Sequence, residues 1–360
     1  MPNSSERPWL SFYSSGVSSN LDYPHIPLHS LLTKSAERYP ERPAIIYLGD
    51  GAAPPATLTY RELDRLSGCF AAGLAGMGVG LGDRVAYFLQ NCPQLVIAFY
   101  GILKAGAVPA PCNPMYTEDE LLRQLDDAQP RLIICDRDTY PRVRGALGGK
   151  PIPAVVVVGG EGPEASFERI LETHGEPGPP VPVDPERDLA LLPYTGGTTG
   201  ISKGAMLTHR NLVVNAMQFA AWYGYEAGKE TFISTLPLFH IGGIAGAMSV
   251  PIMVGATMLL FRRFDARRVL TAIQEYKATR FPAVPTMYIA ALDLEGADQF
   301  SLASLRPSRT SASSLPPAVK RSFDEMAGHE VLIEGYGLTE TSPLTHANPI
   351  HRAKEGSIGV

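Results

Sequence analysis

The sequence predicts an α/β fold with mostly parallel sheets, arranged as two subdomains that pack together. Short apolar runs typical of buried strands alternate with segments of helical periodicity, and the connections between them are short. A proline-rich segment, EPGPPVPVDPERD, interrupts this alternation near the middle of the 360 residues. We interpret that segment as a linker or surface connection, which gives subdomains 24–185 and 186–360.

Helix and strand patterns follow one another closely in the first subdomain. Thr59 and Thr117 are suitable N-caps, and the three acidic residues after Thr117 suit the positive end of a helix dipole. The glycine-rich stretch 76–82 does not complete a GxGxxG pattern, so we interpret it as a helix end and a turn. The expected elements are helix 28–38, strand 44–47, helix 60–77, strand 85–88, helix 94–104, strand 107–111, a helix that begins after 117, and strand 132–135.

The alternation resumes after residue 188. Residues 241–261 carry no charge and are long enough to span a bilayer, but they contain several glycines and Pro251. We therefore interpret them as a buried helix, a turn and a strand at 256–261. The other expected elements are helices 211–222, 267–275 and 316–326 and strands 232–236, 280–284 and 331–334.

Composition and charge exclude several classes of protein. Hydrophobic residues make up 45% of the chain, which argues against general disorder. The net charge of −5 argues against a nucleic-acid partner, although an anionic ligand can still bind through backbone amides and a few lysines. The four cysteines form no CxxC pair, and no signal peptide is visible. We expect a cytoplasmic protein with reduced, buried thiols.

The most informative stretch is LLPYTGGTTGISKGAMLTHRNL at residues 191–212. Its amides and hydroxyls could surround a polyphosphate, and its lysine adds a positive charge. It is not a Walker A loop, and a mobile surface loop is the alternative that the residues alone leave open. Thr208 is expected to cap the helix that follows. The polar centre consists of Thr195, Gly196, Gly197, Thr198, Thr199, Gly200, Ser202 and Lys203.

This stretch resembles the phosphate-binding signature of the AMP-forming acyl-CoA synthetase (adenylate-forming) superfamily. Gly196 and Ser202 stand where the usual signature has serine and proline. Further likenesses follow in the family's order and cover nearly the whole chain, which therefore looks like the large N-terminal domain of that fold. They are LTYREL at 58–63, LPLFH at 236–240, VPTMY at 284–288, SASSLP at 311–316 and EGYGLTET at 334–341.

The resemblance implies a reaction in two steps. A carboxylate attacks the α-phosphorus of ATP to give acyl-AMP and pyrophosphate, and the thiol of CoA then displaces AMP. Lys203, Thr339 and Glu340 would be catalytic, and Thr195 and Glu340 would bind Mg²⁺. The implied ATP- or AMP-binding residues are Thr195, Gly196, Gly197, Thr198, Thr199, Gly200, Lys203, Ala312, Ser313, Glu334, Gly335, Tyr336, Gly337 and Thr339, with Tyr336 stacked on adenine.

The acid is the least determined part of this interpretation. Phe239, His240, Gly242 and Val284 would line the acyl pocket. The motif sequences most resemble those of medium- and long-chain fatty-acid–CoA ligases. An aryl acid stays open, as does a buried structural role for His240. Peripheral membrane contact and a homodimer also stay open.

The family's ribose-binding aspartate motif, hinge and small C-terminal domain with its catalytic lysine are not in this sequence. We therefore expect the C-terminal small domain to be absent and turnover by these 360 residues to be slow or absent. The alternatives are a non-catalytic module that binds an acyl chain or a nucleotide, and an NTPase that releases inorganic phosphate.

Overall fold

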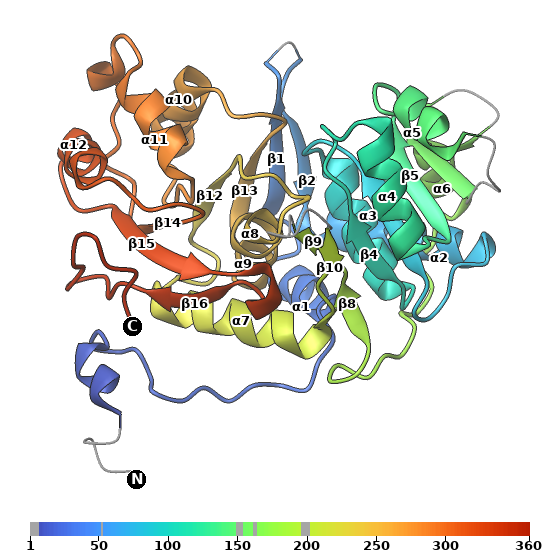
Figure 1. Cartoon of the computed structure of the whole chain (residues 1–360), viewed down its shortest axis with the longest axis horizontal. Coiled ribbons are helices and arrows are strands. Elements are labelled where there is room, and N and C mark those ends of the chain that lie inside the picture. Colours follow the sequence, from blue (N-terminus) through green and yellow to red (C-terminus); the bar gives the residue numbers. More distant parts are fainter. Residues whose placement is uncertain (1–6, 52, 149–153, 161–163, 196–201) are drawn as a thin grey trace.

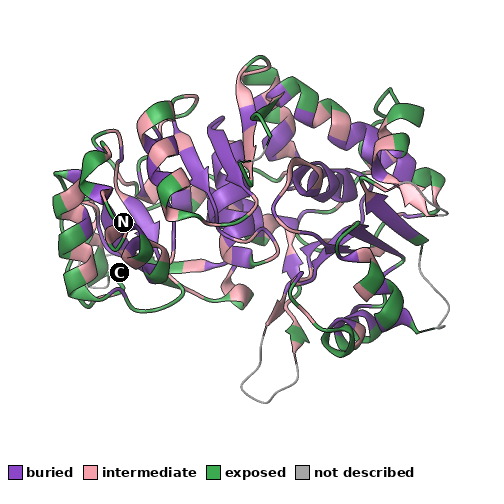
Figure 2. Ribbon diagram, turned by 90° about the horizontal axis from the view of Figure 1, so that it is seen from above, coloured by how far each residue is buried: buried purple, intermediate pink, exposed green. Residues whose placement is uncertain are grey.

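The computed structural model describes residues 7–51, 53–148, 154–160, 164–195 and 202–360. Among these residues there are two larger sheets with helices on both faces, and three smaller sheets (Figure 1). Buried residues concentrate in the strands and on the helix surfaces that face them (Figure 2). Most strand pairs in the larger sheets are parallel, so the predicted α/β fold is confirmed.

One larger sheet is a five-stranded parallel sheet in the order β4–β3–β5–β6–β7. Alternate side chains of its strands enter two different cores, one beneath α4 and α5 and the other beneath α2, α3 and α6. Its strands are β3 (Arg84–Phe88), β4 (Val108–Pro111), β5 (Leu132–Asp136), β6 (Ala154–Val158) and β7 (Ala165–Ser166). Its helices are α2 (Tyr60–Gly76), α3 (Pro93–Lys104), α4 (Glu118–Ala128), α5 (Tyr140–Leu147) and α6 (Phe167–Thr173).

The other larger sheet has the order β12–β13–β1–β2, and only its edge strand β2 is antiparallel. Helices α10, α11 and α12 cover one face, and α1, α7 and α9 pack on the other side of the sheet. Its strands are β1 (Pro43–Gly49), β2 (Ala56–Thr59), β12 (Thr231–Ser234) and β13 (Thr257–Phe261). Its helices are α1 (Ser30–Arg38), α7 (His209–Trp222), α9 (Val250–Met253), α10 (Ala266–Tyr276), α11 (Pro285–Leu292) and α12 (Pro317–Ala327).

The smaller sheets and short helices complete the fold. Strand β14 (Ser308–Thr310) runs parallel to β15 (Leu332–Gly337), which pairs antiparallel with β16 (Leu344–Ala347). The two-stranded sheets are β8 (Leu189–Leu191) with β11 (Leu207–Thr208), and β9 (Tyr194–Thr195) with β10 (Lys203–Gly204). The short helices are η1 (Pro8–Phe12), α8 (Ile241–Gly243), the π-helix η2 (Ile244–Ser249), η3 (Ala297–Gln299) and η4 (Thr339–Thr341).

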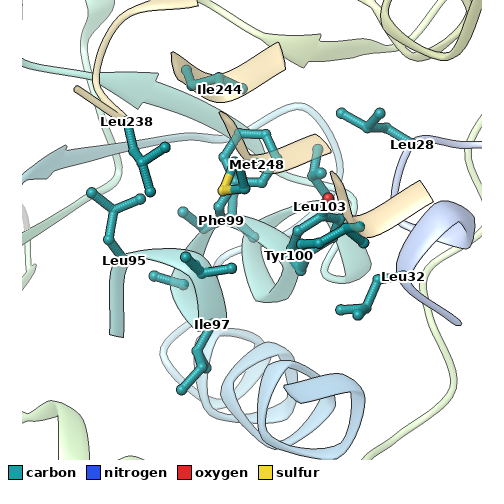
Figure 3. Close-up of a cluster of buried hydrophobic side chains, with 14 of the residues drawn as sticks. Leu28, Leu32, Leu95, Ile97, Phe99, Tyr100, Leu103, Leu238, Ile244 and Met248 are labelled. Atoms are coloured by element: carbon teal, nitrogen blue, oxygen red, sulfur yellow. The ribbon is translucent and has the colours of Figure 1, made fainter. Parts of the chain in front are cut away.

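A continuous hydrophobic core joins the two halves. Side chains of α3, such as Phe99 and Tyr100, lie among those of α1 and of η2, where Ile244 and Met248 point toward them (Figure 3). Within the described residues, no helix is both long and apolar enough to cross a bilayer. As predicted, the uncharged stretch 241–261 is a helical segment that ends in strand β13.

Most predicted elements are present, and two features differ from the prediction or could not be foreseen from it. Residues 280–284 form isolated bridges at Arg280 and Ala283 instead of a strand, because Pro282 has no N–H to continue a ladder. Strands β1 and β2 belong to the first half of the chain but pair in the sheet of β12 and β13. Strand pairing thus crosses residue 185, although the division into 24–185 and 186–360 stays a prediction.

Candidate functional site

A cavity of about 600 Å³ opens where the β9–β10 hairpin, the start of α8, and the ends of β14 and β15 meet. Helix η4 also contributes to its wall. Nine residues that the sequence singled out line this cavity, which unites residues far apart in the chain. They are Thr195, Lys203, His240, Gly242, Val284, Ala312, Gly337, Thr339 and Glu340.

The β9–β10 hairpin places Thr195 and Lys203 opposite each other in register. The Ser202 hydroxyl donates a 2.8 Å hydrogen bond to the Thr195 carbonyl, and the Tyr194 hydroxyl donates a 2.6 Å bond to Asp127 on α4. The hairpin is therefore held against the five-stranded sheet's helices, and the Lys203 ammonium lies at the cavity. Gly196, Gly197, Thr198, Thr199 and Gly200 lie outside the described residues, so their predicted phosphate contacts stay a prediction.

The turn between β15 and β16 carries Thr339 and Glu340 to the cavity. The Leu338 N–H donates to the Pro343 carbonyl at 3.0 Å and to the Thr341 hydroxyl at 3.1 Å, which closes the turn. Gly337 lies so close to the returning chain that a Cβ there would be 2.1 Å from the Pro343 carbonyl oxygen. This close approach fixes where the next three residues lie.

The residues present fit a magnesium ion that is bound together with phosphate. The Glu340 carboxylate is exposed at the cavity and makes no hydrogen bond or ion pair with another described residue. Thr195 lines the same cavity, and its hydroxyl donates one long bond, 3.5 Å, to the Lys203 carbonyl. No group of three or more acidic, histidine or cysteine side chains is preformed for a metal in the described part of the chain. Such a group is not required, because Mg²⁺ in nucleotide sites is held by one or two carboxylates plus phosphates.

Two further predicted ATP- or AMP-binding residues, Ala312 and Gly337, line the cavity. Ala312 has a φ of +78°, a conformation that residues other than glycine rarely adopt. Tyr336 is 42% exposed, and its ring centroid lies 6.2 Å from that of His346 on β16. The Tyr336 ring is therefore free to stack, but it does not line the cavity.

The remaining predicted nucleotide residues also lie off the cavity wall. The Glu334 carboxylate accepts a 3.1 Å bond from the Leu315 N–H, and this bond ties β15 to the segment before α12. Gly335 is buried on β15, and Ser313 is exposed. Glu334 therefore has a structural bond in this arrangement, and contact of these three residues with a nucleotide stays a prediction.

The acyl side of the site begins at His240. Its Nδ1 accepts a 3.1 Å hydrogen bond from the Gly242 N–H and so caps α8, while the ring is open to the cavity. Desolvation, and then the Arg309 guanidinium, lower the His240 pKa, so the ring is neutral near pH 7. Val284 lines the cavity as predicted, but Phe239 packs against the main hydrophobic core.

Arg309 on β14 is the cavity residue that the sequence analysis missed. Its side chain is 3% exposed, and its Cζ lies 5.0 Å from the centre of the Phe219 ring on α7. Burial lowers its pKa from the usual arginine value. The segment Ser308–Thr310 contains no apolar residue, so neither a buried strand nor a buried arginine could be predicted there.

Comparisons with known proteins agree with this site. Residues 32–360 match the family described as AMP-binding enzyme. A long-chain-fatty-acid–CoA ligase of Bacillus subtilis is 36% identical over 99% of this chain and 67% of its own length. A 4-coumarate–CoA ligase of Humulus lupulus is 29% identical over 89% of this chain and 59% of its own length. The chain thus spans about three fifths to two thirds of these curated relatives.

Solved structures show the same fold. A long-chain-fatty-acid-CoA ligase from Archaeoglobus fulgidus superposes with a TM-score of 0.88 and 29% identity, over 97% of this chain and 71% of that one. An anthranilate CoA ligase in complex with anthranoyl-AMP superposes with a TM-score of 0.85 and 26% identity, over 95% and 64%. The match over residues 32–360 and the shared fold lead to one conclusion: this chain belongs to the AMP-binding enzyme family, whose relatives here are acid–CoA ligases.

Proposed function

We propose that this protein takes part in the ATP-dependent activation of a carboxylic acid to acyl-AMP and then to acyl-CoA. The observation that carries the proposal is that one cavity of about 600 Å³ brings Lys203, Thr339 and Glu340 together with His240 and Val284. Lys203, Thr339 and Glu340 suit a nucleotide phosphate and its metal ion, and Val284 suits an apolar acid. A site that joins a carboxylate to a phosphate needs both.

The main difficulty of the reaction is that two anions must approach each other. The Lys203 ammonium and the Thr339 hydroxyl would bind phosphate oxygens and reduce their charge, which needs no covalent nucleophile. The His240 ring is neutral because its pKa is lowered, and its Nδ1 accepts the Gly242 N–H, so its Nε2–H would be the group that donates a hydrogen bond to a ligand. A magnesium ion held by Glu340 and Thr195 would further neutralise the phosphates.

For the acid, we propose a medium- or long-chain fatty acid, with CoA as the thiol. Apolar residues Leu236, Ile241 and Val284 on the cavity wall support a hydrocarbon chain. The fatty-acid ligases of Bacillus subtilis and Archaeoglobus fulgidus also support it, while the coumarate and anthranilate ligases favour an aryl acid as the alternative. The four cysteines are free, which suits the cytoplasm that we propose as its location.

The test combines binding with turnover. The 360-residue chain is titrated with AMP by calorimetry and then given Mg²⁺, ATP, CoA and a panel of fatty and aryl acids while pyrophosphate release is measured. We expect AMP to bind, and pyrophosphate release to be slow and to depend on the acid. Absence of AMP binding would refute the proposal. AMP binding without turnover would favour a binding module, and release of inorganic phosphate would favour an NTPase.

A further inference from the structure

Arg309 is a buried cation that lacks a matching anion. Its side chain is 3% exposed and lines the cavity, and its Nε is buried without a hydrogen-bond partner. A terminal nitrogen donates one long bond, 3.4 Å, to the Gly242 carbonyl. No carboxylate in the described part of the chain pairs with it. The faces of neighbouring aromatic rings, such as Phe219, compensate the charge only weakly.

A second buried arginine shows what a compensated site looks like in this protein. Arg280 is also 3% exposed, but its Nε and a terminal nitrogen donate to the Glu230 carboxylate at 3.0 and 2.8 Å. Its other terminal nitrogen donates to the Pro307 carbonyl at 2.6 Å. Removing a cation from water without such partners is strongly unfavourable, so the uncompensated Arg309 points to an anion that arrives with a ligand.

The position of Arg309 shows which part of a ligand it would meet. Lys203 and Glu340, the phosphate-side residues, are exposed where they line the cavity, whereas Arg309 lines it with a side chain that is buried. We call the exposed part of the wall the mouth and the buried part around Arg309 the floor. The floor is kept open for the guanidinium, because a Cβ at Gly246 would lie 3.1 Å from its terminal nitrogen. An acid activated at the mouth would therefore extend its far end toward Arg309.

A second polar group near the floor is also unpartnered. The Tyr223 hydroxyl on the C-terminal side of α7 is buried with no hydrogen bond, and it lies close enough to Arg309 to affect the arginine's pKa. Tyr223 is not part of the cavity wall, so a ligand would meet Arg309, and a methyl terminus at this floor would leave the guanidinium without an anion. A carboxylate would accept hydrogen bonds from the guanidinium in the forked geometry that arginine offers.

We propose that the preferred acid carries a second carboxylate at the end opposite the one that is adenylated, and that Arg309 binds it. This inference rests on the proposed function and narrows its substrate class to dicarboxylic acids with a hydrocarbon middle. Ile241 and Val284 on the cavity wall suit that middle. Arg309 is thus a specificity-determining residue, separate from the residues proposed to bind the phosphates.

The test uses stable acyl-adenylate analogues, so it does not depend on turnover. Acyl-sulfamoyl adenosines are prepared in pairs of matched chain length, from hexanoate and adipate, octanoate and suberate, and decanoate and sebacate. Their dissociation constants for the 360-residue chain are measured by calorimetry. We expect the analogue with the free terminal carboxylate to bind at least ~10-fold tighter in one or more pairs, as one charge-assisted hydrogen bond provides.

Two variants and a control locate the effect. Arg309→Met should remove the preference, and Arg309→Lys should keep part of it, since the charge remains but the fork is lost. Arg321→Met, an exposed arginine paired with Glu355 outside the cavity, should leave the preference unchanged. The wild-type pairs decide the matter even if Arg309→Met does not fold.

The outcomes separate the two proposals. Hydrocarbon analogues that bind the wild type as well as or better than their carboxylate partners in every pair would overturn this inference and leave the proposed function standing. Failure of AMP and of all the analogues to bind would overturn the proposed function, and this inference with it.

Discussion

Gly337 offers a sharp test of how the turn after β15 positions the site. In Gly337→Ala the new Cβ would start 2.1 Å from the Pro343 carbonyl oxygen, where real contacts are at least 3.0 Å. One side of the turn must therefore move by about 1 Å. We expect the free energy of unfolding to fall by about 1–3 kcal/mol, as in other overpacked sites.

The larger effect should be on nucleotide binding, because Thr339 and Glu340 lie only two and three residues after Gly337. A shift of about 1 Å would lengthen charge-assisted hydrogen bonds to phosphate, each worth about 1.5–3 kcal/mol, so ATP should bind ~10- to 100-fold more weakly. Calorimetry with Mg²⁺ and ATP measures this change, and urea unfolding measures stability.

Two other glycine-to-alanine variants provide a milder case and a control for Gly337→Ala. Gly335→Ala, on the same strand, would place its Cβ 3.1 Å from the His346 carbonyl oxygen, so a few tenths of an ångström of movement suffice and the loss should be smaller. Gly80→Ala meets nothing within 4 Å and controls for the change of residue type. If Gly337→Ala bound ATP as tightly as the wild type, the close approach at Pro343 would not be what positions the phosphate side.

Three further predictions concern charge. Lys203→Ala should weaken ATP binding at least ~10-fold with little change in melting temperature, because its side chain is exposed at the cavity. Glu230→Gln should lower the unfolding free energy by about 3–5 kcal/mol, or the melting temperature by roughly 4–7 °C, because it leaves the buried Arg280 without its anion. Burial lowers the pKa of His29 to about 4 and of His209 to about 3, so both are neutral when folded. Their contribution to stability is complete above pH 6.5 and falls toward pH 4 by up to ~1.4 kcal/mol per pH unit for each histidine, which urea unfolding at pH 7 and pH 5 measures.

Each of these three predictions has a control variant or an outcome that would contradict it. Lys34→Ala, on the exposed face of α1, should leave ATP binding unchanged, and an equal loss of stability and binding in Lys203→Ala would indicate a structural lysine. Lys229→Ala removes an exposed ion pair and should cost far less stability than Glu230→Gln. His209→Asn should flatten the pH dependence, and an unchanged slope would exclude His209 as its source.

The sequence predicted best what depends on neighbouring residues. Thr59, Thr117 and Thr208 all accept the N-cap hydrogen bond expected of them, from Glu62, Glu120 and Asn211 respectively. These caps act within one helical turn, so the local pattern contains the information. The motif resemblance likewise predicted that Thr195, Lys203 and Glu340 share a site, and the cavity brings them together.

What could not be predicted depends on distant parts of the chain. The pairing of β1 with β13 joins residues more than 200 positions apart, and no local pattern specifies that partner. Phe239 was expected in the pocket because it adjoins His240, but proximity in sequence does not determine which face a side chain takes, and it packs in the core. Arg309 was missed because the strand that buries it has only three residues, all polar.

The position of β1 between β2 and β13 has a consequence for how the chain is made. A ribosome that adds about 5–20 residues per second needs roughly 10–40 s to progress from β1 to β13. Throughout that interval the β1–β2 pair presents an apolar edge whose permanent neighbour has not yet been synthesised. Nascent chains of this protein should therefore depend on a chaperone until residue 261 has left the exit tunnel, and ribosome-bound chains cut short before β13 should be the ones that aggregate.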